Sequence, residues 1–147
     1  MFTTTTEYAL RAAVFLAESP ARQTAHSVAA ATHVPERYMS KVLQVLVDAG
    51  LADSQRGPSG GFILSRPPRA ITALEVVQAV EPIRRIETCP LGLPEHCPTL
   101  CPLHQLLDSL AGIAESRLGG TTLADLIGHP IMPLGIRPSE RTIAPPR

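Results

Sequence analysis

The stretch PERYMSKVLQVLVDAGLADSQRGPSGGFILS, residues 35–65, decides the fold. Its first part predicts a two-faced helix, because apolar and polar residues each recur there at helical spacing. The apolar set is Met39, Val42, Leu43, Leu46 and Val47, and the polar set is Arg37, Ser40, Lys41, Gln44 and Asp48. Pro35 and Glu36 are typical of a helix start, and Gly50 is typical of the position just beyond a helix end.

The second part of the stretch predicts a β-hairpin. The segments LADSQR and GFILS have the length of short strands, and GPSG joins them. Three glycines and a proline within residues 57–61 favour a tight, exposed turn with Arg56 at its edge. A hairpin placed directly after such a helix is typical of a DNA-binding wing, which would bring Arg56 to phosphates or into a narrow minor groove. The alternative for Arg56 is an ordinary solvated side chain.

Two more helices are expected before residue 35. TTTTEYALRAAVFLAES predicts the first, with Thr4 and Glu7 at the spacing of a capping box. TAHSVAAATHV predicts a short second helix with Thr24 as its N-cap. The order of these elements is that of a helix-turn-helix: a short helix, a tight turn, and a helix that begins with small polar and basic residues. The second helix of this motif lies in the DNA major groove. An ordinary amphipathic helix with a solvated face is the alternative.

The sequence after the hairpin predicts three further helices. TALEVVQAVEP has a capping box at Thr72 and Glu75 and a stop at Pro82. PLHQLLDSLAGIAESRLGG predicts a long helix that ends at two glycines, and TTLADLI a short last one. The long helix carries one apolar stripe, formed by Leu103, Leu106, Leu107, Leu110, Ile113 and Ala114. We expect this stripe to pack against a second copy of the chain, with burial inside one chain as the alternative.

Composition narrows the class of protein. The 147 residues are 44% apolar with zero formal net charge, and only 3% are aromatic, which disfavours stacking on single-stranded nucleic acid. No segment has the length of a membrane span or the pattern of a signal peptide, so we expect a cytoplasmic protein without a membrane partner. The sequence contains no GxSxG, HExxH, P-loop or dinucleotide-binding motif, so we expect no enzymatic activity.

The sequence resembles the Rrf2 family of winged helix-turn-helix transcriptional regulators, of the IscR, NsrR, RirA and CymR type. The resemblance covers about residues 1–128 and rests on EYALRA, PERYMSKVLQVLVDAGL, RGPSGGFIL, ITALEVVQAVEP and TTLADL. It implies a homodimer that binds a palindromic double-stranded operator as a repressor or activator. Several members of the family hold an iron–sulfur cluster in the loop before the dimer helix.

All three cysteines lie in that loop, CPLGLPEHCPTLCPLH, residues 89–104. An odd number of cysteines in a cytosolic chain points to metal or redox chemistry rather than to disulfides. Cys89, Cys97, Cys101 and His104 could supply the four ligands of a two-iron two-sulfur cluster. Pro102 is the expected first residue of the long helix, so His104 would lie in its first turn, near Cys101.

The spacing of the loop, C-x7-C-x3-C-x2-H, leaves alternatives open. Its C-x2-H ending is similar to the IscR pattern, but its gap between the second and third cysteines is shorter than in cluster-binding relatives. The resemblance also offers Glu7 of the other subunit as the fourth ligand in place of His104. A zinc site, thiol redox chemistry and no metal at all are the remaining interpretations of the loop.

These observations predict a mostly α-helical fold with a small β wing. A winged helix-turn-helix domain spans 1–82, a connector and cysteine loop 83–102, a dimerisation helix with a short following helix 103–128, and a disordered tail 129–147. The residues expected to contact DNA are Thr24, Arg37, Tyr38, Ser40, Lys41, Arg56, Ser59 and Gly60. The predicted function is a homodimeric regulator that senses redox state, iron or nitric oxide through an iron–sulfur cluster. A regulator that uses zinc, free thiols or another ligand is the alternative, and an electron-transfer protein is the alternative from another class.

Overall fold

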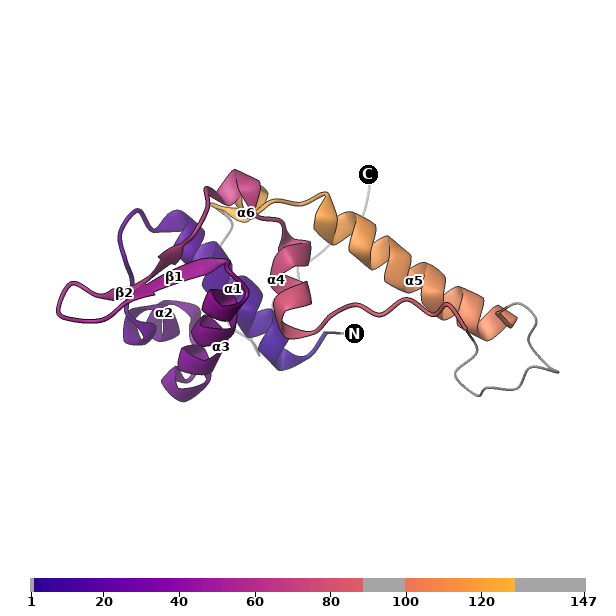
Figure 1. Cartoon of the computed structure of the whole chain (residues 1–147), viewed down its shortest axis with the longest axis horizontal. Coiled ribbons are helices and arrows are strands. Elements are labelled where there is room, and N and C mark those ends of the chain that lie inside the picture. The colour runs from indigo at the N-terminus through magenta and orange to yellow at the C-terminus, as the bar shows by residue number, and fades with distance from the viewer. Residues whose placement is uncertain (1, 89–99, 129–147) are drawn as a thin grey trace, which may run out of the picture.

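The computed structural model describes residues 2–88 and 100–128 (Figure 1). Cys89, Cys97 and the predicted tail 129–147 lie outside these residues. The elements are α1 (Thr4–Glu18), α2 (Ala25–Thr32), α3 (Glu36–Asp48), β1 (Ala52–Gln55), β2 (Gly61–Leu64), the 3-10 helix η1 (Pro68–Ala70), α4 (Ala73–Val80), α5 (Pro102–Gly119) and α6 (Leu123–Leu126). Figure 1 shows a body formed by α1–α4, the hairpin and α6, from which α5 extends outward. The mostly helical prediction with a small β wing is confirmed.

The start of α1 differs from the predicted capping box. The N-cap is Thr3, whose hydroxyl accepts from the backbone N–H of Thr6, while Glu7 instead pairs with Arg11 at 2.8 Å. The reason is a tertiary contact with the end of α4. The Glu81 carboxylate accepts from the Thr3 backbone N–H at 3.0 Å and from the buried Thr6 hydroxyl at 2.8 Å. These hydrogen bonds hold the pKa of Glu81 below its usual value.

Helices α2 and α3 form the predicted helix-turn-helix. Thr24 caps α2 as predicted, since its hydroxyl accepts from the Ser27 backbone N–H at 3.0 Å. His33 lies in the left-handed region at φ 55° and turns the chain toward α3. The predicted apolar face of α3 is confirmed, because Met39, Val42, Leu43 and Leu46 are buried in the core. Gly50 follows the helix end at φ 70°, a conformation that favours glycine.

The hairpin is attached to the body by a segment before α2. Strands β1 and β2 pair antiparallel, from Ala52 opposite Leu64 to Gln55 opposite Gly61. Gln23 adds an isolated bridge to Phe62, and the two residues exchange both backbone hydrogen bonds at 2.8 Å. The wing is therefore fixed along one side and free at its tip.

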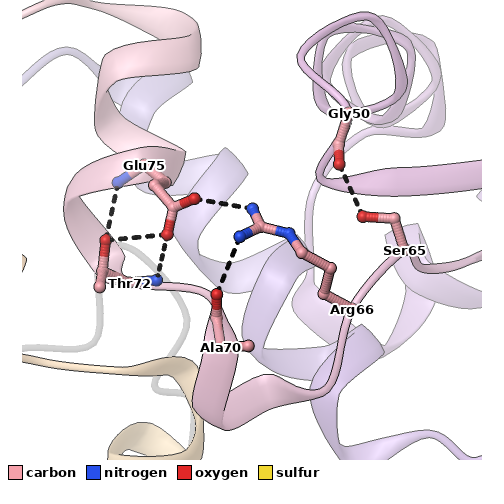
Figure 2. Close-up of polar contacts among 6 residues, drawn as sticks. All are labelled: Gly50, Ser65, Arg66, Ala70, Thr72 and Glu75. Carbon is pink, nitrogen blue, oxygen red and sulfur yellow. Dashed lines mark hydrogen bonds and ion pairs between the residues drawn. The ribbon is translucent and has the colours of Figure 1, made fainter.

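A chain of polar contacts joins the end of α3 to the start of α4 (Figure 2). The Ser65 hydroxyl donates to the Gly50 carbonyl at 2.6 Å, and the next residue, Arg66, donates to the Ala70 carbonyl at 2.9 Å. Arg66 also donates to Glu75 at 2.7 Å, and Glu75 completes the predicted capping box with Thr72. The segment after β2 thus ties the two helices together.

The long helix α5 is exposed over most of its surface. It has no fully buried residue, whereas Leu123 of the following α6 is completely buried in the core of the body. The C-terminal end of α5 is therefore anchored through α6, and its other end extends away from the body, as Figure 1 shows. Among the described residues, no helix is both long and apolar enough to cross a membrane.

Candidate nucleic-acid interface and cysteine loop

Four of the predicted DNA-contact residues lie together at the start of α3. Arg37, Tyr38, Ser40 and Lys41 are exposed, while the apolar side of the same helix faces the core. The Arg37 guanidinium lies 4.6 Å from the centre of the Tyr38 ring and donates to its hydroxyl at 2.9 Å. This contact orients both side chains on the outer face, where an exposed aromatic residue and a cation can meet bases or phosphates.

The wing places its predicted residues at an exposed tip. Arg56 and Ser59 are exposed, and Gly60 lies where a Cβ atom would come within 2.3 Å of the Gln55 carbonyl oxygen. Within residues 2–88 and 100–128, neither Arg56 nor Lys41 forms an ion pair. Both cations are therefore available to an anionic ligand.

Gly61 holds the base of the wing against the body. Its φ is +130°, and an added Cβ would lie 2.6 Å from the Gln23 carbonyl oxygen. We expect Gly61→Ala to lower the free energy of unfolding by about 2–4 kcal/mol, because it combines backbone strain with lost hydrogen bonds. Gly57→Ala is the matched control, since Gly57 has φ +107° with no atom near its Cβ position. Urea denaturation should show the smaller loss for Gly57→Ala, and equal losses would contradict the role of the Gln23 contact.

The described part of the cysteine loop brings one predicted pair of ligands together. Cys101 is the N-cap of α5 and Pro102 its first residue, as predicted, and the Cys101 Sγ lies 3.3 Å from the His104 Nδ1. Two ligands on one tetrahedral metal, with bonds of about 2.3 Å to sulfur and about 2.0 Å to nitrogen, lie about 3.5 Å apart. The pair therefore fits ligation of a single metal ion with little movement.

Among the described residues, no other predicted ligand joins this pair. Cys89 and Cys97 lie outside the described residues, and within those residues no three possible ligands are grouped. Glu7 lies on α1, which Figure 1 shows far from the N-terminal end of α5 in the same chain. Its carboxylate accepts from Arg11, whose Nη1 is buried without a hydrogen-bond partner among the described residues.

An apolar surface covers one side of α5. It consists of five side chains that are 45–60% exposed, namely Leu103, Leu106, Leu107, Leu110 and Ile113. Leu107 and Leu110 also line a groove of about 310 Å³, which Phe2, Pro82 and Ile83 close from the other side. Exposed apolar side chains gathered on one side of a helix are typical of a surface that contacts another molecule.

Two structural contacts were not predicted from the sequence. The Gln23–Phe62 bridge joins segments far apart in the chain and has no local signal. Arg85 of the connector pairs with Asp108 and Glu115 of α5. A signal for this second contact exists, because Gly112 is unfavourable inside a helix unless another group must approach closely.

Comparison with known proteins places the chain among transcriptional regulators. Residues 2–129 match the Rrf2 family, described as "Iron-dependent Transcriptional regulator". A protein of Aquifex aeolicus (strain VF5) that bears the name of an HTH-type transcriptional regulator is 30% identical over 132 residues, which cover 86% of this chain and 91% of the relative.

Two solved structures share the fold. CymR, the global cysteine regulator of B. subtilis, superposes with a TM-score of 0.71 at 27% identity, over 86% of this chain and 95% of CymR. T. potens IscR superposes with a TM-score of 0.70 at 25% identity, over 86% of this chain and 85% of IscR.

Proposed function

The chain belongs to the Rrf2 family of transcriptional regulators, and on this premise we propose that it is a homodimer that binds a palindromic DNA operator in the cytoplasm. The observation that carries the proposal is the exposed polar start of α3, together with an exposed wing whose arginine is unpaired within the described residues. Arg37, Tyr38, Ser40 and Lys41 would meet bases and phosphates in the major groove. The wing would add phosphate or minor-groove contacts through Arg56, Ser59 and Gly60, and Thr24 would contribute from the start of α2.

The apolar face of α5 supports the dimer. A helix with five large apolar side chains about half exposed gains stability when a second copy covers them. The groove beside Leu107 and Leu110 extends this surface toward Phe2 and the connector. In a two-fold dimer the same surface is used twice, so two recognition helices would be presented to two half-sites about 34 Å apart.

The cysteine loop supports a sensor role. We infer that Cys89, Cys97, Cys101 and His104 hold a two-iron two-sulfur cluster, with Glu7 of the other subunit as the alternative fourth ligand. The close Cys101–His104 pair supports this ligand set, and it would also suit zinc. When bound, such a cluster responds to oxidants, iron supply or nitric oxide. The protein's part is to hold the ligands at the exposed end of α5, beside the proposed dimer surface.

Loss of a basic side chain from the proposed interface should weaken DNA binding in a salt-dependent way. We expect Lys41→Ala and Arg56→Ala each to reduce affinity about tenfold for a duplex that wild-type protein selects from a random library. Each lost phosphate contact should also make the negative slope of log K against log salt less steep by about one. Fluorescence anisotropy titrations at several salt concentrations measure both quantities.

Arg69→Ala is the matched control for these two variants. Arg69 is an exposed arginine of η1 that forms no ion pair among the described residues, so its removal changes the net charge equally. If both interface variants bind with wild-type affinity and salt slope, the assignment of these residues to DNA contact is wrong.

A further inference from the structure

Arg85 attaches the connector to α5 through ion pairs with Asp108 and Glu115, and these contacts form the Arg85 clamp. Its Nε donates to the Asp108 Oδ1 at 2.8 Å and its Nη2 to the Oδ2 at 2.6 Å, which gives a bidentate pair. Its Nη1 reaches Glu115 at 3.4 Å, and the neighbouring Ile86 backbone N–H donates to Asp108 at 2.8 Å. Bidentate arginine–carboxylate pairs fix geometry more tightly than single contacts do. The hydrogen bonds from Arg85 and Ile86 lower the pKa of Asp108 to about 2.

Gly112 lies next to the Arg85 guanidinium and leaves room for it. A Cβ atom at this position would lie 3.2 Å from the central carbon and from Nη1 of the Arg85 guanidinium. Glycine is unfavourable in the middle of a helix, yet it occurs here in the 18-residue helix α5. The absence of a side chain lets the guanidinium lie against the helix between Asp108 and Glu115.

The clamp faces away from the apolar surface of α5. Asp108, Gly112 and Glu115 are spaced by four and three residues and therefore share one side of the helix. Leu106, Leu110 and Ile113 follow the same spacing on the opposite side. The clamp therefore stays intact when a second copy of the chain covers the apolar surface.

The two ends of α5 are held in different ways. Its C-terminal end continues into α6, where the Leu123 backbone N–H donates to the Ile71 carbonyl at 2.9 Å and the Leu123 side chain is buried. Toward the other end, the connector runs beside α5, as Figure 1 shows. The Arg85 clamp ties this connector to the middle of the helix. A change in the clamp would thus change the angle between α5 and the body.

We propose that Arg85 is a positioning residue for operator recognition, which sets the distance between the two recognition helices by fixing α5 against the body. The proposal rests on the proposed function, because it requires a dimer formed through α5 and DNA contact through α3. A tilt of α5 at the dimer axis displaces each α3 relative to its half-site. The clamp would therefore determine which half-site spacing the dimer accepts, without touching DNA.

The test measures spacing preference rather than affinity alone. The probe is a duplex selected by wild-type protein from a random library, together with versions in which one or two base pairs are inserted or removed between the half-sites. A duplex with a single half-site serves as the reference for intrinsic contact. We expect wild-type protein to prefer the selected spacing at least tenfold, and Arg85→Ala to reduce that preference below threefold. Affinity for the single half-site should stay within about twofold of wild type.

Two further variants separate positioning from folding. Gly112→Leu should reduce the preference for the selected spacing, as Arg85→Ala does, because the leucine side chain displaces the guanidinium. The substitution keeps every charge and improves helix propensity. Arg84→Ala is the matched control, since Arg84 is exposed and forms no ion pair among the described residues. It should keep the wild-type preference.

The outcomes distinguish the two proposals. If wild-type protein selects no duplex, the proposed function fails and this inference fails with it. If wild-type protein selects a spaced duplex, and both Arg85→Ala and Gly112→Leu keep its spacing preference, the proposed function stands and the positioning role of Arg85 is wrong.

Discussion

Leu110→Asp is expected to convert the dimer into monomers and to abolish tight operator binding. Leu110 is 49% exposed in the single chain and lies at the centre of the apolar surface of α5. In a two-fold interface the substitution places two carboxylates in an apolar contact, and burying an unpaired charge costs several kcal/mol. The dimer dissociation constant should therefore rise at least about 100-fold. Sedimentation velocity at micromolar concentration measures this change directly.

Ser116→Asp is the control for Leu110→Asp. Ser116 is an exposed residue of the same helix that lies off the apolar stripe, so the added charge should leave the dimer intact. Operator affinity should follow the oligomeric state, because a monomer contacts only one half-site. A wild-type protein that sediments as a monomer, or a Leu110→Asp protein that remains a dimer, would contradict the proposed interface.

Most elements of the fold could be predicted because their signals are local. The Thr72–Glu75 capping box, the Thr24 cap and Gly50 each act within one turn of the chain, so the sequence alone identifies them. The start of α1 could not be placed, since four consecutive threonines are equivalent as caps. The choice among them is made by Glu81, which lies 78 residues from Thr3 in the chain.

The candidate site likewise contains features that local sequence predicts and features that it does not. Cys101 and His104 were predicted to be neighbours and are, because residues three apart at a helix start lie in one turn. The Arg85–Asp108 pair spans 23 residues and joins an exposed side chain to a partly buried one, a contact that no periodicity predicts. Gly112 is the one local signal that could have indicated a group approaching α5, but a glycine does not identify that group. Contacts between side chains that lie far apart in the chain can therefore be identified only from the structure.

Cys101→Ser is expected to abolish the metal centre. Anaerobically reconstituted wild-type protein should hold about two iron and two sulfide per chain, with the visible absorption of a two-iron cluster. Cys101 is proposed to supply one of three thiolates, and a serine hydroxyl is a poor substitute for a soft sulfur ligand. Iron and sulfide analysis should therefore show loss of nearly all of both. Cys89→Ser and Cys97→Ser should behave in the same way.

His104→Ala and Glu7→Ala separate the two candidates for the fourth ligand. The Cys101–His104 distance of 3.3 Å favours His104, so His104→Ala should shift the visible spectrum while Glu7→Ala leaves it unchanged. The reverse result would assign the ligand to Glu7 of the other subunit, and Leu110→Asp should then disturb the spectrum as well. Wild-type protein that takes up zinc stoichiometrically but no iron would overturn the cluster and retain the site, because a cysteine–histidine set also suits zinc. Wild-type protein that binds neither metal would show that the cysteine loop is not a metal centre, and the signal would then act elsewhere on the dimer.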